Sequence, residues 1–382
     1  MNKKGNPVCL HYLSSYLPLT ENWIYKILIN YRKYLPVIIT RSIQNLDLFH
    51  IKPIYNLGSL RQFRKTLQLL YFKAFDYIPF FYRTGKNENV DILHVHFGNH
   101  GVKSIGLKRK LNVPMVCSFY GADAFKYPAI KNNHSKLKRL FNEADKILVL
   151  GPYMRGELRK LGCPENKLLI QHLGIENEKI RFEKRRYNPD EPMKFLMASS
   201  FVEKKGIDIA LKAFAKIKSE YSFTIEIIGD GPLKGNISEL IDNLDLVDRI
   251  KLHGYQTYDY FIQLAYKNDV FVQASKTTDK NDMEGTPMSL VDAMATGMPV
   301  VSTRHSDIPE IVIDGVNGFL STENSIDDFA RNLRKVFRSS DLGELSKNAR
   351  EHVEKNFNIK TQVGKLEVLY SELINRNKDE VV

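Results

Sequence analysis

The second half of the chain alternates short β-branched runs with segments of helical periodicity. Between residues 194 and 303 the apolar runs KFLMASS, FTIEIIG, RIKLHG, VFVQAS and PVVST are separated by stretches whose apolar residues recur every three to four positions. This alternation is typical of βαβ units, in which crossover helices join parallel strands. We therefore predict a doubly wound α/β domain over residues 187–356.

The first half repeats the same rhythm less regularly. Strands are expected at VCLHYL, PVIIT, DILHVHF, PMVCSF and KILVLG, with helices between them. Charged residues and two prolines interrupt the periodicity over residues 183–192, which marks a hinge. We expect one Rossmann-like domain over residues 1–186, a second over 187–356, and a helix in 357–382 that returns toward the first domain.

Length and composition are compatible with a soluble or peripheral protein. A chain of 382 residues that is 43% hydrophobic can bury two cores. No window approaches the roughly 20 apolar residues of a membrane span, and the N-terminal apolar stretch is interrupted from Glu21 onward, so no export signal is predicted. The spacing of the cysteines fits neither a disulfide framework nor a thiolate metal site; they are Cys9, Cys117 and Cys163. We expect a cytoplasmic protein, soluble or peripheral on the inner face of the plasma membrane.

The charge is distributed unevenly between the halves. Residues 1–186 hold 32 Lys and Arg against 13 Asp and Glu, a balance of +19, whereas residues 187–382 hold 24 against 31, a balance of −7. A basic half suggests an anionic partner, such as a lipid surface, a diphosphate-linked acceptor or nucleic acid. No helix-turn-helix, RNP-like or zinc-ligand pattern accompanies the basic residues, so nucleic acid is not expected as a partner.

Residues 60–85 combine an apolar stripe with cations and resemble an interfacial amphipathic helix. The apolar positions at helical spacing are Leu60, Phe63, Leu67, Leu70, Phe75, Ile78 and Phe81. The alternative is that the stripe packs on the domain's own sheet. The many aromatic residues favour contact with an anionic membrane.

The most specific constellation is DMEGTPMSLVDAMATGMPVVST, residues 282–303. Its loop carries Glu284 and a glycine that lets the backbone approach a ligand, and a helix whose free N–H groups form an anion site begins near Pro287. Asp292 lies about two turns further along, on roughly the same side as Glu284. Two acceptors at this separation could hold two sugar rings.

This segment resembles the family-4 retaining glycosyltransferases of the two-domain GT-B fold, whose mark is a Glu, seven residues and a second Glu. The resemblance implies that Glu284 contacts the transferred sugar and that Asp292, here in place of the second Glu, binds the ribose of the nucleotide. It also implies an α/β architecture of two Rossmann-like domains facing across a cleft. It covers residues 145–320 well and the first domain loosely.

A second match is SSFVEKKGIDIALKAF, residues 199–214, in which Lys205 corresponds to the diphosphate-binding lysine. Ser200 stands where the family usually has an Arg, and Arg304 is a conceivable substitute for that missing cation. The glycines of IIGDGPLKG, residues 227–235, agree with the family's turn after a strand. The donor-binding set implied is Ser200, Lys205, Gly229, Gly231, Tyr255, Glu284, Gly285, Thr286, Pro287, Met288, Ser289, Leu290 and Asp292.

In the first domain, SFYGADAF, residues 118–125, is similar to the family's His-Gly-x-Asp turn, with Tyr120 in place of the His that faces the donor sugar. Tyr120 joins Glu284 and Lys205 as an expected catalytic residue. The opening loop YLPLTENWIY, residues 16–25, resembles an exopolysaccharide-synthesis branch. Acceptor or sugar contacts are expected from residues that end a strand or form this turn: His96, Gly98, Asn99 and Asp123. For Asp123 the alternative is an N-cap or a turn residue.

His94 and His96 share one face of a predicted strand and could suggest a metal site. No third ligand stands nearby in sequence at a diagnostic spacing, and no Asp-x-Asp motif or GxxxxGK loop is present, so no metal or other cofactor is expected. The resemblance implies that a hexose moves with retention from a nucleoside-diphosphate sugar, UDP- or GDP-linked, to a lipid-linked saccharide in surface-polysaccharide synthesis. The alternatives are a nucleotide-sugar epimerase or phosphorylase on the same fold and a non-catalytic homologue.

Overall fold

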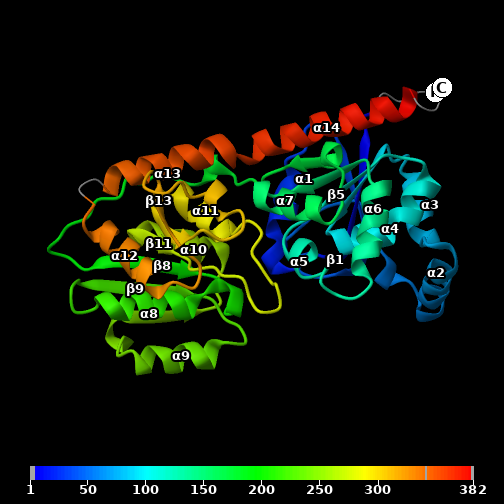
Figure 1. The fold of residues 1–382 in the computed structure, drawn as a ribbon. Coiled ribbons are helices and arrows are strands. Elements are labelled where there is room, and N and C mark those ends of the chain that lie inside the picture. The colour runs from blue at the N-terminus through cyan, green and yellow to red at the C-terminus, as the bar shows by residue number, and fades with distance from the viewer. Residues whose placement is uncertain (1–4, 340–341, 380–382) are drawn as a thin grey trace. The chain divides into compact units, whose positions relative to one another are not determined.

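The computed structural model describes residues 5–339 and 342–379, which form two compact units (Figure 1). The first unit comprises residues 5–174 and 359–379, and the second is Ile175–Asn358. Each is built on one sheet whose strand pairs are parallel. Within the described residues no helix is both long enough and apolar enough to cross a bilayer.

The division between the units lies at Gly174, twelve residues before the predicted boundary at residue 186. Residues 175–186 fold with the second unit because Ile175 and Ile180 are buried in its core. The buried Arg185 side chain also donates to the carbonyl of Ala265 and to Thr296 Oγ1, at 2.8 and 3.0 Å. The first part of the predicted hinge, residues 183–192, is therefore fixed to the second unit by Arg185.

The first unit alternates strands and helices along most of its length. Its strands are β1 (Val8–Tyr16), β2 (Leu35–Ile43), β3 (Ile54–Asn56), β4 (Ile92–His96), β5 (Met115–Ser118), β6 (Lys146–Val149) and β7 (Leu168–Ile170). Its helices are α1 (Asn22–Ile29), α2 (Gln62–Phe75), α3 (Pro79–Asn87), α4 (Gly98–Leu111), α5 (Ala122–Phe125), α6 (Asn133–Glu143), α7 (Pro152–Lys160) and α14 (Ile359–Asp379). The sheet order is β3-β2-β1-β4-β5-β6-β7, so the strand order reverses between β1 and β4.

The C-terminal helix α14 is tied to the first unit by buried polar contacts. The hydroxyl of Tyr370 lies 2.9 Å from that of Tyr31 and 2.5 Å from Nδ1 of His94 on β4. One carboxylate oxygen of Glu367 accepts the backbone N–H groups of residues 32 and 33 at 2.7 and 2.6 Å. These contacts account for the grouping of residues 359–379 with a sheet that precedes them by more than 180 residues.

The stripe predicted over residues 60–85 is two helices. Asp76 adopts a left-handed conformation with φ of 62° and ends α2, and α3 starts at Pro79. The second half of the stripe is core, since Ile78 and Phe81 are only 6% and 3% exposed. No residue of α2 is buried, so the alternative that the stripe packs on the unit's own sheet holds for α3 and is wrong for α2.

The second unit has the more regular alternation. Its strands are β8 (Met193–Ala198), β9 (Phe223–Ile228), β10 (Ile250–Gly254), β11 (Val270–Val272), β12 (Val300–Thr303) and β13 (Gly318–Ser321). Its helices are α8 (Ile207–Ile217), α9 (Lys234–Asn243), α10 (Tyr258–Lys267), α11 (Met288–Ala295), α12 (Ile326–Phe337) and α13 (Leu342–Asn356). The order is β10-β9-β8-β11-β12-β13, with the reversal between β8 and β11.

Both faces of this second sheet are covered, which explains its continuous apolar runs. Phe195 of β8 faces a core made with α8, α9 and α12, whereas its neighbour Leu196 faces a core made with α10, α11 and part of α13. Figure 1 shows α8 on one side of the sheet and α11 on the other. In a doubly wound sheet, ligands bind at the carboxyl ends of the strands where the order reverses, here after β8 and β11.

Candidate active site

Lys205 and Glu284 meet at the reversal point of the second sheet. Lys205 ends a 3-10 turn, Glu203–Lys205, that follows β8, and Glu284 lies in the loop between β11 and α11. Lysine Nζ is 2.7 Å from Oε1 of Glu284, and the two side chains are 15% and 7% exposed. The contact is a charge pair rather than a directed hydrogen bond. The structure thus brings together two of the three residues predicted to be catalytic.

Gly206 fixes the path of the chain directly after Lys205. Its φ is +59°, and a Cβ there would lie 1.8 Å from the carbonyl oxygen of Ala274. Gly229 and Gly231 lie against residues 199–201, since Cβ atoms there would lie 1.9 Å from the carbonyl oxygen of Ser199 and 2.8 Å from that of Phe201. Close backbone packing therefore positions residues 199–206 and places Lys205 opposite Glu284.

The Glu284 loop is held from several sides. Lys204 Nζ lies 3.0 Å from Asp282 Oδ1 and 3.2 Å from the carbonyl oxygen of Met283. The backbone N–H of Glu284 donates to Nε2 of His305 at 3.0 Å, and Nδ1 of this histidine lies 2.8 Å from Oε1 of Glu323. His305 and Glu323 follow β12 and β13. His305 begins the stretch HSDIPEIVIDGVNGFL, residues 305–320, which also resembles the family, but neither residue was predicted as a site residue.

Asp292 lies on the buried face of α11 and is 4% exposed. The hydroxyl of Tyr258, at the start of α10, donates to its Oδ1 at 2.8 Å. Burial and the neighbouring Asp292 carboxylate raise the pKa of Tyr258 far above its ordinary value, so the phenol keeps its proton and remains a donor. Tyr258 was not predicted; its partnership with Asp292 exists only because α10 and α11 pack together.

The remaining predicted donor residues occupy three settings. Helix α11 starts at Met288 with Pro287 as its N-cap, and no side chain caps it, so its first N–H groups are directed toward the loop. Gly285, Pro287 and Leu290 are buried, while Thr286, Met288 and Ser289 are half-buried. Ser200 is exposed in the turn after β8, and Tyr255 is 59% exposed after β10. Arg304, considered as a substitute cation, lies 2.5 Å from Asp314 Oδ2 and so already has a carboxylate partner.

In the first unit, Asp123 organises the turn that carries Tyr120. Its carboxylate accepts the backbone N–H groups of Gly98, Tyr120 and Gly121 at 2.8, 3.0 and 3.0 Å. Burial raises the pKa of Asp123 despite these three hydrogen bonds. A Cβ at Gly98 would lie 2.1 Å from the ring of Phe119. In this structure Asp123 and Gly98 both shape the turn, and both carboxylate oxygens of Asp123 accept backbone N–H groups.

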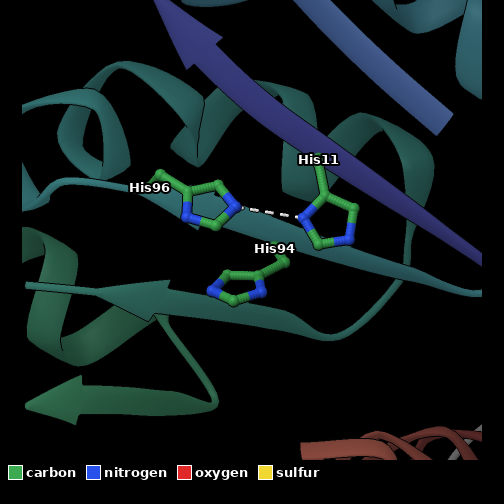
Figure 2. Close-up of side chains that lie close together, drawn as sticks. All are labelled: His11, His94 and His96. Carbon is green, nitrogen blue, oxygen red and sulfur yellow. Dashed lines mark hydrogen bonds between the residues drawn. The ribbon is translucent and has the colours of Figure 1, made fainter. Parts of the chain in front are cut away.

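The structure brings a third histidine to the predicted pair. Strand β1 runs parallel to β4 with His11 opposite His94, so a histidine distant in sequence joins the pair, which no local spacing indicates. The candidate ligand atoms of His11, His94 and His96 lie within 4.8 Å of one another, and Figure 2 shows His11 and His96 pointing toward each other. All three side chains are at most 1% exposed.

Most nitrogens of this histidine cluster already have partners. His11 Nδ1 lies 3.1 Å from His96 Nε2, and His96 Nδ1 lies 2.7 Å from the hydroxyl of Tyr120. His94 contacts Tyr370 and the hydroxyl of Ser118. The rings of His94 and His96 are stacked at 4.4 Å, an arrangement in which their in-plane lone pairs do not converge on one ion. We interpret the cluster as a buried hydrogen-bonded network that supports Tyr120.

A cavity of about 320 Å³ opens beside this turn in the first unit. It is lined by Glu21, Phe97, Asn99, His100, Ala122, Asp123, Lys126, Tyr127 and Ile130. Oδ1 of Asn99 is buried there without a hydrogen-bond partner. Burial, together with Asp123, raises the pKa of Glu21 to about 7. Of the four predicted acceptor or sugar contacts, Asn99 and Asp123 line this cavity, whereas His96 and Gly98 are buried and do not line it.

Comparison with known proteins identifies the family. The family model "Glycosyltransferase Family 4" matches residues 32–179, and "Glycosyl transferases group 1" matches residues 178–356. WcaL of Escherichia coli (strain K12), described as a colanic acid biosynthesis glycosyltransferase, is 33% identical over 276 residues, which cover 70% of this chain and 67% of WcaL. The chain belongs to the family-4 glycosyltransferases. The amylovoran biosynthesis glycosyltransferase AmsK of Erwinia amylovora is 32% identical, with 70% of this chain and 67% of AmsK covered.

Solved structures of glycosyltransferases share the fold. HepE of Anabaena, solved in complex with UDP, has a TM-score of 0.79 at 17% identity, with 96% of this chain and 100% of HepE covered. HepE has also been solved with UDP-glucose. The predicted GT-B fold class, with two Rossmann-like α/β units, is confirmed. This family-4 chain is therefore a glycosyltransferase by membership, which favours glycosyl transfer over the epimerase alternative.

Proposed function

We propose that this glycosyltransferase moves a hexose, with retention at the anomeric carbon, from a nucleoside-diphosphate sugar to a saccharide acceptor in surface-polysaccharide synthesis. The observation that carries the proposal is the Lys205–Glu284 charge pair at the reversal point of the second sheet. The names of WcaL and AmsK, both polysaccharide-synthesis proteins, support the class of product.

The chemistry explains why a lysine and a glutamate would lie together. Breaking the anomeric bond leaves positive charge on the sugar and adds negative charge to the departing diphosphate. In the proposed mechanism Lys205 and the first N–H groups of α11 hold the diphosphate, and Glu284 faces the sugar. Binding of donor would then exchange the Lys205–Glu284 contact for contacts with the two ends of the substrate. No metal or other cofactor is part of this proposal.

The route we propose is attack on the same face of the sugar, without a stable covalent intermediate. The acceptor hydroxyl approaches from the side of the leaving diphosphate, its oxygen forms the new bond to the anomeric carbon, and its proton goes to a departing phosphate oxygen. The anomeric configuration is retained because the acceptor oxygen bonds to the anomeric carbon on the same face of the sugar from which the diphosphate leaves. The role of the protein is then to bind the two substrates in this geometry and to exclude water.

Asp292 is proposed to hold the ribose. Its carboxylate points from α11 with one oxygen engaged by Tyr258, which fixes its direction. Because Asp is one methylene shorter than the family's Glu, the hydroxyl of Tyr258 would help to define the ribose position. UDP is the first nucleotide to test, since HepE has been solved with UDP and with UDP-glucose.

The cavity beside Asp123 is the proposed location of an acceptor ring. Phe97 and Tyr127 offer flat apolar walls, and Asn99 offers an unpaired amide oxygen to a sugar hydroxyl. Tyr120, the third predicted catalytic residue, adjoins this turn and is proposed as a sugar contact. Its pKa is raised by burial, so it would act as a neutral hydroxyl.

Helix α2 is proposed to touch an anionic membrane that carries a lipid-linked acceptor. Its apolar side chains are exposed, Phe63 at 75% and Phe75 at 59%, and cations including Arg64 and Lys65 lie on the same helix. Burying exposed apolar area in a bilayer and attracting anionic headgroups would act together.

The membrane proposal is tested by sedimentation with phosphatidylglycerol vesicles at low salt. Replacing both Phe63 and Phe75 with Ser should reduce the bound fraction several-fold, because about 2 kcal/mol of transfer free energy is lost for each ring. Leu48→Ser is the control, since Leu48 is 59% exposed in the same unit but outside α2. Equal binding by the double variant and the wild type would disprove this role of α2.

The central experiment is a thermal-shift panel of UDP, GDP, ADP and TDP with their sugars. A ligand that binds only the folded state at 100 times its Kd stabilises it by about 2.7 kcal/mol. We expect one nucleotide to raise the melting temperature of the wild type, and Lys205→Ala to abolish the shift. Lys212→Ala, a lysine on α8 that is 42% exposed, should respond like the wild type.

The remaining alternative is a non-catalytic homologue. If folded wild-type protein shows no shift in melting temperature with any nucleotide, the hypothesis of a non-catalytic homologue replaces the proposed function. The exposed Ser200, which stands where the family has an arginine, would then be the first residue to test as the cause of the lost nucleotide binding. A shift that survives in Lys205→Ala would keep nucleotide binding and remove Lys205 from the proposed site.

A further inference from the structure

A hydrogen-bonded chain behind Glu284 connects three strand ends of the second unit. The N–H of Glu284, in the loop after β11, donates to Nε2 of His305, which follows β12. Nδ1 of His305 contacts Oε1 of Glu323, which follows β13. The other carboxylate oxygen of Glu323 accepts the N–H of Thr277 at 2.8 Å.

The direction of these bonds fixes the proton on His305. A backbone N–H can only donate, so Nε2 is the unprotonated acceptor and Nδ1 carries the proton that is donated to Glu323. Burial acts to raise the pKa of Glu323, but hydrogen bonds from His305 and Thr277 hold it below its ordinary value. Glu323 is therefore a carboxylate that accepts from both partners.

The hydrogen-bonded chain secures one loop at two points. Thr277 lies five residues after the end of β11, in the segment that leads to α11, and Glu284 stands seven residues later. Glu323 holds the loop at Thr277 directly and at Glu284 through His305, whose ring is fully buried. Between them, Thr278 Oγ1 accepts the N–H of Asp282 at 3.0 Å. With its N–H fixed, the backbone of Glu284 has little freedom to rotate, and its side chain is aimed at Lys205.

We propose that His305, oriented by Glu323, is a positioning residue that sets the direction of the Glu284 carboxylate toward the transferred sugar. This inference rests on the proposed role of Glu284, but the geometric part stands separately. Displacing a reacting group by about 1 Å can cost 100-fold in rate. A histidine suits the task because it accepts from a backbone N–H with one nitrogen and is oriented through the other.

Three variants separate positioning from packing. In His305→Gln the amide oxygen can take the place of Nε2 and accept from Glu284. His305→Leu has similar bulk but offers no acceptor. Glu323→Gln keeps an acceptor oxygen for one partner but removes the negative charge that selects the Nδ1–H form of His305. Each variant is first checked for its melting temperature, so that folding losses are known.

The first readout needs no substrate. We expect ¹⁵N spectra to show an unprotonated Nε2 on His305, and hydrogen exchange at the Glu284 amide to be at least 10-fold faster in His305→Leu than in the wild type or His305→Gln. Equal protection in His305→Leu, in folded protein, would overturn the proposal. So would a His305 whose Nε2 carries the proton.

The second readout uses UDP-glucose and measures release of UDP. Loss of positioning should lower kcat about 10- to 100-fold in His305→Leu while KM changes less than 3-fold, and His305→Gln should recover most of kcat. A wild-type kcat retained by His305→Leu would refute the catalytic part. If the wild type neither binds nor cleaves any nucleotide sugar, the proposed function fails, and amide exchange still decides whether His305 positions Glu284.

Discussion

Lowering the pH from 7 to 5.5 should weaken the folding of the first unit through its buried histidines. Burial holds the pKa of His94 at about 3 and that of His100 at about 4, and it lowers the pKa values of His11 and His96 well below 6.5. In the unfolded chain these side chains gain protons below pH 6.5, whereas in the folded unit they stay neutral. The contribution of these neutral histidines to the free energy of unfolding is therefore complete above pH 6.5, and it is lost as the pH falls toward their pKa values in the folded unit.

The magnitude follows from proton linkage. With an unfolded pKa of 6.5 and a folded pKa far below 5.5, one histidine costs about 1.2 kcal/mol between pH 7 and pH 5.5. The carboxyl of Glu21 opposes this, because its folded pKa of about 7 lies above the unfolded value and proton uptake stabilises the folded state on acidification. Asp123 shifts in the same direction as Glu21. A comparison of variants cancels both contributions.

The assay is urea unfolding followed by the fluorescence of Trp23, the single tryptophan of the chain, which lies on α1 of the first unit. His11→Phe should lose less stability than the wild type on going from pH 7 to pH 5.5, by about 1.2 kcal/mol, because one proton-binding group is gone. His50→Phe is the control, since that ring is exposed in the folded unit. An identical pH dependence in His11→Phe and wild type would refute the reasoning.

Two further predictions concern the second unit, and both are measured as unfolding free energies. Gly206→Ala should cost 3 kcal/mol or more, about the sum of a left-handed φ and a severe overlap with a backbone carbonyl, whereas Gly235→Ala, in open space on α9, should be neutral or stabilising. Tyr258→Phe should cost about 1–3 kcal/mol because a buried oxygen of Asp292 loses its donor. Tyr260→Phe, 38% exposed, should cost about half of that or less. Equal losses within either pair would contradict the packing or the burial on which the estimates rest.

The sequence predicts the α/β fold because parallel strands are buried on both faces. Runs such as PVVST must be apolar at every position, and a run of that kind is visible without knowing its neighbours. The strands left unpredicted are β3, β7 and β13, each of three or four residues and each at the end of a sheet order. A short edge strand needs little apolar character, so its pattern is weak.

The amphipathic segment shows where periodicity misleads. Residues 60–85 carry one apolar stripe, but the chain turns at Asp76, and the two halves face different surroundings. Phe75 is 59% exposed and Phe81 is 3% exposed, although both belong to the same predicted stripe. Pro79 carried the signal of a break, since proline favours the first turn of a helix over its interior.

Some residues of the candidate site can be predicted from local motifs, whereas others join the site only through tertiary packing. Lys205 and Glu284 were found because each lies in a local motif, and the sheet reversal then brought them within 2.7 Å. Tyr258, His305 and Glu323 come from other crossovers, and an isolated tyrosine, histidine or glutamate carries no mark of its partner. Their contribution depends on where β10, β12 and β13 end, which no spacing in the sequence specifies.

The histidine cluster extends this argument to the first unit. His94 and His96 are two residues apart on one strand, so their shared face is readable, but His11 joins them through the parallel register of β1 and β4, 83 residues earlier in the chain than His94. The three neutral imidazoles lie against one another, and one of them, His96, contacts the hydroxyl of Tyr120, so they form a support with few charges and several hydrogen bonds. Such a support can hold the Tyr120 hydroxyl in place at neutral pH, and it weakens under acid because its members must stay unprotonated to remain buried.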